Sequence, residues 1–382
     1  MNLNLTTVTR YGLNVLAALG ASIALFFGKP VFIPVTIAGL LAAILWPGAK
    51  WLHRRVRMPW FLACCTVVLS LVFVVMLIFA LVGVSFSQIL NDIPKPNDDA
   101  SMQRSYSSIR DKFREALPFV TPSSFNSVLP TSAEDSGLYR ELKRFFYSEQ
   151  FTSLLLNLTG HSFSLMTESV LVIFTLLFLL VEGQMLLNKI RNIFGPMPES
   201  RSQVSASFRQ MAESVRSYLV WRTIINIGLG ILFGVFYYLM GLKQHAVLWA
   251  LLTMILCYIP YLGTIAAGVL PILDAVVTVS PWTGVAVLIF YTVVVTVEGY
   301  LIVPWMMGRS MDLNATTVLI SCLYWYLVWG TAGLFLAMPI MAAIRVICSN
   351  VPGWESWGSL MSSEESPHKT KEEPIQLTPS QP

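Results

Sequence analysis

The sequence is short of charged residues. Only 12% of its 382 residues are Asp, Glu, Lys or Arg, whereas 55% are hydrophobic. A soluble globular chain carries roughly 25% charged residues, so about half of the expected charge is missing. The mean hydropathy is +0.65. This composition excludes an ordinary soluble domain and indicates a membrane protein.

The sequence also lacks the short motifs of common enzymes. It has no GxxxxGK[ST] phosphate loop, no HExxH or CxxC pair and no GxSxG elbow. The four histidines are scattered, and the five cysteines lie in or at the end of apolar runs, where packing is their expected role. We therefore expect no enzyme activity, no cofactor and no metal site. The net charge of +4 indicates no nucleic-acid partner, because Lys and Arg gather at the ends of the apolar runs.

What the sequence has instead is a series of long runs without any charged residue. These runs are 11–28, 30–49, 58–91, 223–242, 244–273, 275–297 and 313–344. Most are close to or above the ~20 residues that a spanning helix needs. They are continuous, unlike the alternating strands of a membrane barrel. The sequence predicts an all-α polytopic membrane protein with about eight transmembrane segments.

Polar residues divide the chain into five expected parts. These are N-terminal transmembrane helices in 1–90, a small helical extracytoplasmic cap in 91–160, transmembrane helices with a cytoplasmic connector in 161–242, a C-terminal transmembrane core with broken helices in 243–350, and a disordered cytoplasmic tail in 351–382. We expect the first two spans, 12–28 and 31–50, to form a hairpin.

Basic residues indicate the orientation of these parts. One cluster, His53 to Arg57, follows the second predicted span, and another, Lys189 to Arg209, follows the fourth. Cytoplasmic loops carry an excess of Lys and Arg. Both clusters are therefore expected in the cytoplasm, together with the N- and C-termini, and the cap outside.

The run 244–273 contains residues that interrupt helices. Proline removes a backbone donor and clashes with the preceding turn, and Pro260 and Pro271 both lie here, with Gly263 between them. Inside a membrane, broken backbone is tolerated only where protein or a water-filled cavity surrounds it. Several transporter folds place such breaks around their substrate. The stretch from Ile259 to Gly263 therefore predicts a functional break.

A second stretch resembles the first. In 261-YLGTIAAGVLPILDAVV and 328-VWGTAGLFLAMPIMAAI, Gly263 aligns with Gly330. One extra residue, after Gly333 in the second stretch, then brings Pro271 and Pro339 into register. Two interpretations stay open: a pair of re-entrant hairpins that belong to a structural repeat, or two kinked spans with packing glycines.

Glu298 is the ionisable residue that we expect to matter most within the membrane. It follows the uncharged run 275–297, and an acid at membrane depth should face protein or a cavity. There it would carry a proton, hydrogen-bond a polyol, or only join helices. Glu182 is expected at a membrane boundary, and nothing in the sequence suggests a partner for Asp274.

With these motifs in view, the chain resembles the autoinducer-2 exporter (AI-2E) family of bacterial permease-like membrane proteins over residues 12–348. The matching motifs are 34-PVTIAGLLAAILWP-47, Tyr218-Leu219, Leu248 to Gly263, Glu298 to Arg309 and Trp329 to Pro339. This chain has Gly299, Val303 and Trp305 where the family often has Asn, an acid and a base, so ion coupling could differ here.

The resemblance implies a secondary transporter in the bacterial inner membrane that exports a small polar solute, such as autoinducer-2, without ATP. It also implies a homo-oligomer, such as a pentamer. A cation/proton antiporter, with protons or sodium as partners, is the first alternative; a passive channel or a membrane scaffold with a partner-binding cap is the second. The expected path or hinge residues are Pro260, Gly263, Thr264, Pro271, Glu298, Pro304, Gly308, Arg309, Gly330, Gly333 and Pro339, with Asp274 and Glu182 as further membrane acids.

Overall fold

The computed structural model describes residues 7–92, 99–146, 148, 162–194, 198–303, 305, 313–350 and 354–362. These residues form helices, turns and loops, with no strand among them. Six helices in this part of the chain are long and apolar enough to cross a membrane, and four further apolar helices are shorter. The all-α polytopic prediction is confirmed. Where about eight spans were expected, the described residues have these six long helices and the four shorter ones, some of which pair as hairpins.

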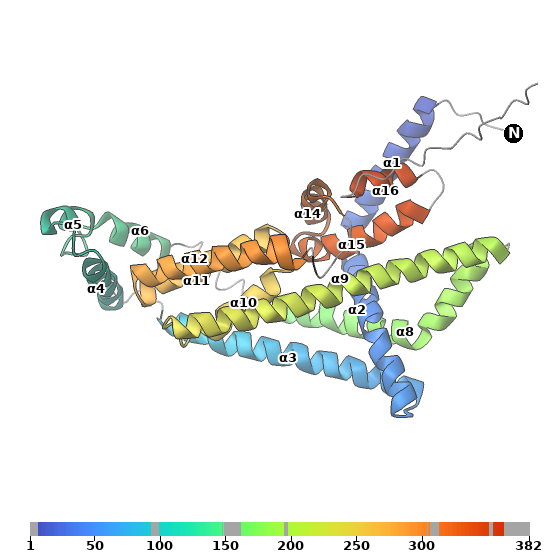
Figure 1. The fold of residues 1–382 in the computed structure, drawn as a ribbon, viewed down its shortest axis with the longest axis horizontal. Coiled ribbons are helices and arrows are strands. Elements are labelled where there is room, and N and C mark those ends of the chain that lie inside the picture. The colour runs from blue at the N-terminus through green and yellow to red at the C-terminus, as the bar shows by residue number, and fades with distance from the viewer. Residues whose placement is uncertain are drawn as a thin grey trace, which may run out of the picture.

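The long helices form the body of the molecule (Figure 1). They are α2 (Lys29–Arg55), α3 (Trp60–Asp92), α8 (Ser162–Phe194), α9 (Pro198–Leu239), α12 (Pro281–Val297), which the π-helix η1 (Glu298–Ile302) extends, and α15 (Thr331–Asn350). The shorter apolar helices are α1 (Thr7–Phe27), α10 (Ala246–Leu256), α11 (Leu262–Thr278) and α14 (Ala315–Trp329), which α15 follows directly. A last helix, α16 (Glu355–Met361), follows α15.

The expected hairpin between the first two spans does not form. The Gly28 amide donates to Ala24 O over 2.8 Å, and the Phe32 amide donates to Gly28 O over 2.9 Å, so helical hydrogen bonds continue across the junction. Helices α1 and α2 accordingly run end to end (Figure 1). The Gly28-Lys29-Pro30 sequence resembles a turn, but proline is also well suited to the first turn of a helix, and α2 uses it there.

The polar connector expected after the fourth span is mostly helical as well. Helix α8 continues to Phe194 and α9 begins at Pro198, well before the apolar run of α9 starts at Thr223. Polar residues therefore extend the helix past its apolar part.

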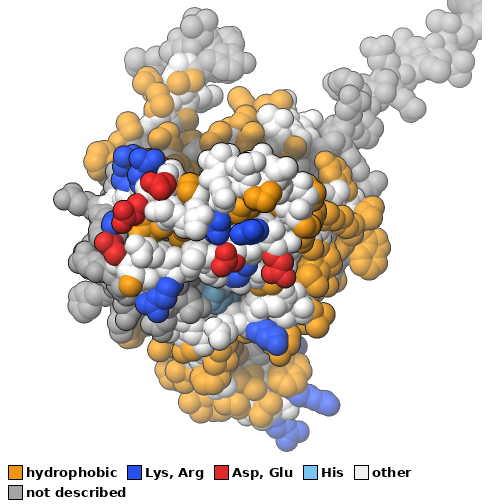
Figure 2. Space-filling view, turned by 90° about the vertical axis from the view of Figure 1, so that its left-hand side faces the viewer, with side chains coloured by type: hydrophobic (Ala, Val, Ile, Leu, Met, Phe, Trp, Pro, Cys, Tyr) orange, Lys and Arg blue, Asp and Glu red, His pale blue; other side chains and the backbone are white. Residues whose placement is uncertain are grey.

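The described residues of the polar segment 91–160 form three short helices at one end of the long axis: α4 (Asp99–Ala116), α5 (Pro122–Val128) and α6 (Gly137–Phe146). Their small core contains Met102, Tyr106, Phe125, Leu129 and Tyr139. Figure 2 views the molecule from this end, where acidic and basic side chains gather and apolar side chains surround them.

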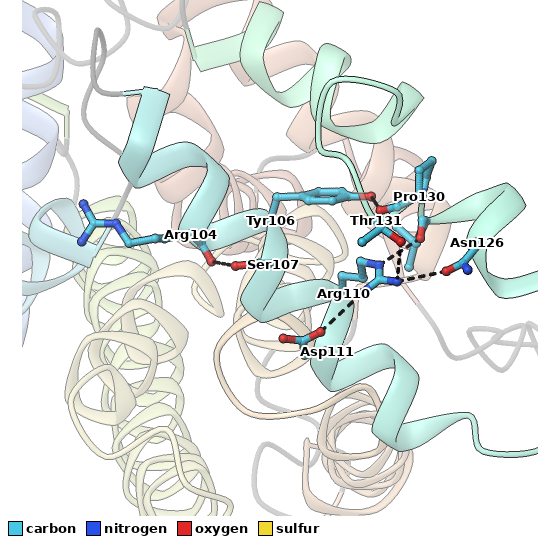
Figure 3. Close-up of polar contacts among 9 residues, drawn as sticks. Arg104, Tyr106, Ser107, Arg110, Asp111, Asn126, Pro130 and Thr131 are labelled. Carbon is cyan, nitrogen blue, oxygen red and sulfur yellow. Dashed lines mark hydrogen bonds and ion pairs between the residues drawn. The ribbon is translucent and has the colours of Figure 1, made fainter. Parts of the chain in front are cut away.

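Arg110 joins the elements of this cap. Its guanidinium donates to Leu129 O over 3.1 Å, to Asn126 Oδ1 over 3.0 Å and to Thr131 Oγ1 over 3.3 Å (Figure 3). Asp111 lies 3.6 Å from the same guanidinium. A single buried arginine thus ties α4 to α5 and to the loop after it, which compensates for a small apolar core.

Helices α10 and α11 form a first hairpin, and α14 and α15 form a second. Lys112 of the cap donates to Val277 O and Thr278 O at the end of α11, so the first hairpin opens toward the cap. The second opens beside α16, at the other end of the long axis (Figure 1). The two hairpins therefore open away from each other, and neither stretch is one continuous helix.

Helix α9 is the helix against which both hairpins pack. Gly230 and Gly234 face α10: a Cβ at Gly230 would lie 2.2 Å from Met254 Cγ, and one at Gly234 would lie 3.0 Å from Ala250 Cβ. This GxxxG motif therefore marks close helix packing, as such motifs do in membranes.

Candidate functional site at two broken helices

The first hairpin reverses at residues 257–261. Leu262 N–H donates to Pro260 O over 2.7 Å, and Tyr261 between them has φ 60° and ψ −63°. These values describe a γ-turn with positive φ, a rare and strained conformation. Strain of this kind persists only where the surrounding structure imposes it, and it clusters at functional sites.

After this turn, the start of α11 lies very close to the end of α10. A Cβ at Gly263 would lie 1.8 Å from Leu256 O, a distance that no side chain can adopt. Thr264 Oγ1 donates to Tyr261 O over 2.8 Å and so stabilises the first turn of α11. Glycine at position 263 is therefore required by the approach of two backbones.

The second hairpin has the same construction. Gly330 has φ 64°, and a Cβ at Gly333 would lie 1.9 Å from Trp325 O. The equivalent pairs are thus Tyr261 with Gly330, which adopt positive φ, and Gly263 with Gly333, which allow close approach. The sequence alignment had paired Gly263 with Gly330, so its register is shifted by three residues at this point.

The two broken ends contact each other. Ile259, in the first break, belongs to the same buried cluster as Trp325, Trp329 and Leu334 of the second hairpin. Pro271 and Pro339 lie further along α11 and α15, inside these helices, and both are fully buried. The prolines are thus packed kink positions, and the chain reverses elsewhere.

A buried ion pair lies beside the first break. Arg222 Nη1 of α9 is 2.5 Å from Glu298 Oε1, and the two residues are 8% and 4% exposed. Arg222 Nη2 also donates to Cys257 O, at the broken end of α10. One guanidinium therefore joins α9, the break and the start of η1.

Glu298 itself opens an irregular turn. Residues Glu298–Ile302 form a π-helix, and Val303 N–H donates to Glu298 O. Single π-helical turns of this kind are frequent at functional sites. The acid that the sequence singled out thus lies where α12 departs from regular geometry.

Polar side chains of α9 contact the last turn of α10, at its broken end. Asn226 Nδ2 donates to Met254 O over 3.1 Å, and the Thr223 and Tyr258 hydroxyls are 2.6 Å apart. The last carbonyls of a helix have no partner within it, so these contacts stabilise the break. Asn226 Oδ1 is buried without a hydrogen-bond partner among the described residues.

Arg222, Thr223 and Asn226 were not among the residues predicted from the sequence. Arg222 directly precedes the uncharged run 223–242, and a charged residue inside a span is itself a signal of a functional or paired group. The polar residues recur on one face of α9 because Arg222 and Asn226 are four positions apart.

A second polar cluster lies at the open end of the first hairpin. Asp274 Oδ2 is 2.8 Å from His245 Nδ1 and accepts a 2.6 Å hydrogen bond from Trp249 Nε1. The sequence suggested no partner for Asp274; His245 and Trp249 reach it because α10 packs against α11. The cap contacts the same region, where Lys112 binds the end of α11 and Trp282 Nε1 donates to Ala116 O over 2.9 Å.

The remaining expected residues lie elsewhere. Glu182 is exposed on α8, apart from both clusters. Pro304, Gly308 and Arg309 lie outside the described residues. Within the described part of the chain, no group of three His, Cys, Asp or Glu residues could hold a metal ion.

Comparison with known proteins identifies the group to which this architecture belongs. The AI-2 transport protein TqsA of Escherichia coli K12 is 24% identical over 359 residues, which cover 93% of this chain and 97% of that protein. The putative transport protein YhhT of the same strain is 26% identical over 353 residues, covering 90% and 92%. A putative transport protein of Haemophilus influenzae is 27% identical over 213 residues, covering 56% and 60%. The sequence profile of the AI-2E family transporters matches residues 13–353, and the chain therefore belongs to this family of membrane transporters.

Proposed function

We propose that the protein is a secondary transporter that exports a small polar solute, of the autoinducer-2 type, across the bacterial inner membrane. One observation carries this proposal: two hairpins that open at opposite ends bring their broken ends together beside the Arg222–Glu298 pair. Buried charges and broken backbone are costly in a membrane unless they face protein or a hydrated path. Transporters use such breaks to bind solutes near the midplane.

The polar groups at this point suit an uncharged, hydroxyl-rich solute. Arg222 and Glu298 offset each other in charge, and Asn226 Oδ1 is an acceptor without a partner among the described residues. The name of the Escherichia coli relative, an AI-2 transport protein, supports a solute of this kind. The proposed path follows the face of α9 that carries Arg222 and Asn226.

Transport into everted membrane vesicles tests the proposal. Vesicles that contain the protein should accumulate autoinducer-2 when respiration energises them, and should not do so after an uncoupler is added. Glu298→Gln should abolish accumulation, whereas Glu182→Gln, at an exposed acid, should leave it unchanged. Equal accumulation by vesicles with and without the protein would reject this solute.

Glu298 favours a second candidate, a cation/proton antiporter. A buried acid that exchanges its arginine partner for a proton would couple an ion gradient to the movement of the hairpins. In proteoliposomes with an imposed sodium gradient, an internal pH dye should then report proton movement that Glu298→Gln removes. Solute flux that is downhill only, without any ion coupling, would indicate a passive channel, and no flux of any kind would leave the scaffold alternative.

We further propose that the cap lies outside the cytoplasm and that the termini lie inside. The basic residues from His53 to Arg57 lie at the C-terminal end of α2, away from the cap, which supports this orientation. The protein is proposed to work as a homo-oligomer, such as a pentamer. Mass measurement of the protein in lipid nanodiscs tests the number of copies.

A further inference from the structure

Helix α16 packs closely on the end of the second hairpin. A Cβ at Gly358 would lie 2.8 Å from Ser349 Oγ and 3.3 Å from Ser349 N, so the two helices approach with no side chain between them. Ser349 belongs to the last turn of α15, a helix long and apolar enough to cross the membrane. Helix α16 is therefore fixed at the level where this span ends.

Asn314 attaches the other end of α16 to the start of α14. The Asn314 backbone N–H donates to Met361 O over 2.9 Å, and its side chain donates to Leu360 O over 2.8 Å. The same side chain caps α14, because its Oδ1 accepts from Thr317 N–H over 2.7 Å. Both helices of the second hairpin are thus bound to α16 at their open end.

The free flank of α16 is apolar and aromatic. Trp357 and Leu360 are 58% and 66% exposed, and Trp354 just before the helix is 53% exposed. At 3.6 residues per turn, Trp357 and Leu360 lie about 60° apart on one flank, whereas the exposed Ser359 lies on the other flank, about 160° from Trp357 and about 100° from Leu360. The helix therefore has a packed side, an apolar flank and a polar flank.

We propose that the apolar flank of α16 is inserted into the polar–apolar boundary of the lipid bilayer, so that α16 anchors the open end of the second hairpin to the membrane surface. Ile347, in the last turn of α15, is 42% exposed, so the apolar surface of the span reaches to within a few residues of α16. Tryptophan is enriched at membrane interfaces. A helix with one polar and one apolar flank lies in the plane of that interface.

The two ends of the second hairpin would then have different surroundings. Its open end is held at the membrane surface, while its broken end packs against the first break through Trp325, Trp329 and Leu334. Movement of this hairpin would therefore pivot about α16. This inference concerns the lipid contact alone and does not depend on which solute is transported.

Fluorescence quenching in liposomes tests it. In a variant without the five native cysteines, one cysteine is introduced by Leu360→Cys or Trp357→Cys, with Ser359→Cys as the matched control on the polar flank. Each is labelled with an environment-sensitive dye and reconstituted into phosphatidylcholine liposomes. A lipid with a nitroxide near the headgroup and iodide on both sides of the membrane serve as quenchers.

The dyes at positions 357 and 360 should be quenched several-fold more strongly by the nitroxide lipid than the dye at 359, and the order should reverse for iodide. Equal quenching by iodide at all three positions would place the flank in water and overturn the proposal. Protection of positions 357 and 360 from both quenchers would overturn it too, because protein, such as a second copy of the chain, would then cover the flank. Elution of each labelled variant at the volume of the cysteine-free parent controls for folding.

Discussion

Arg222 Nη1 and Glu298 Oε1 lie 2.5 Å apart, and this pair connects α9 to the irregular turn after α12. We expect Glu298→Gln to destabilise the protein by about 3–5 kcal/mol, because loss of one partner leaves an uncompensated buried charge. The double variant Arg222→Gln/Glu298→Gln should recover most of that stability while transport stays lost. Unfolding midpoints of the purified variants in detergent measure this coupling. Additive losses in the double variant would show that the two side chains act independently.

The close approaches at Gly263 and Gly333 give a second prediction. We expect Gly263→Ala and Gly333→Ala each to lower stability and abolish transport, because the added Cβ meets a backbone carbonyl at less than 2 Å. Gly39→Ala is the matched control, since a Cβ at Gly39 meets no atom within 4 Å. Vesicle transport and protein yield are measured together. Normal transport by either variant would show that the hairpin can open at that point without cost.

The positive-φ positions behave differently from these glycines. Gly330→Ala should cost about 1–3 kcal/mol of stability, the range for a residue held in a sparsely populated backbone conformation. Tyr261→Gly should relieve the same kind of strain and raise the unfolding midpoint. Little packing should be lost, because the tyrosine side chain is 48% exposed. A fall in the midpoint of Tyr261→Gly would mean that the tyrosine side chain stabilises the turn.

The Asp274 cluster joins α11 to His245 and Trp249 at the open end of the first hairpin. Asp274→Ala leaves both His245 and Trp249 without this acceptor, and an unsatisfied buried group costs about 1–3 kcal/mol. We expect faster hydrogen exchange in α10 and α11 and little change in α14. Thr292→Ala on α12, where the hydroxyl bonds only to Leu288 O of its own helix, is a control. Unchanged exchange in α10 would show that apolar packing alone holds this hairpin.

Cysteine labelling tests the orientation. In a cysteine-free background, Ser107→Cys on the cap should react with an impermeant thiol reagent in intact cells, and Ala206→Cys on the polar extension of α9 should react only after lysis. Both positions are exposed in the structure. Ser136, also in the cap, is buried and would not serve as a reporter. Labelling of Ala206→Cys alone in intact cells would invert the proposed orientation.

Composition and local motifs are enough to predict the class of the protein and the places where its helices break. Long uncharged runs can satisfy their backbone only as helices in a membrane, so composition is sufficient for that conclusion. Pro260, Gly263 and Gly330 marked both breaks because their backbone properties are local. Glu298 was identified for a similar reason, since the cost of an acid at membrane depth can be read from its neighbours in the chain.

How these local features meet depends on the packing of helices that are distant in the sequence. The Gly28-Lys29-Pro30 sequence is compatible with a turn or with a continuing helix, and the packing of α1 and α2 selects the helix. The partner of Glu298 lies 76 positions earlier in the chain, and the partners of Asp274 lie on α10. The true equivalence of Gly263 with Gly333 depends on which carbonyl each glycine approaches. Ion pairs and close contacts between distant segments are set by how helices pack, and no local pattern in the sequence records that arrangement.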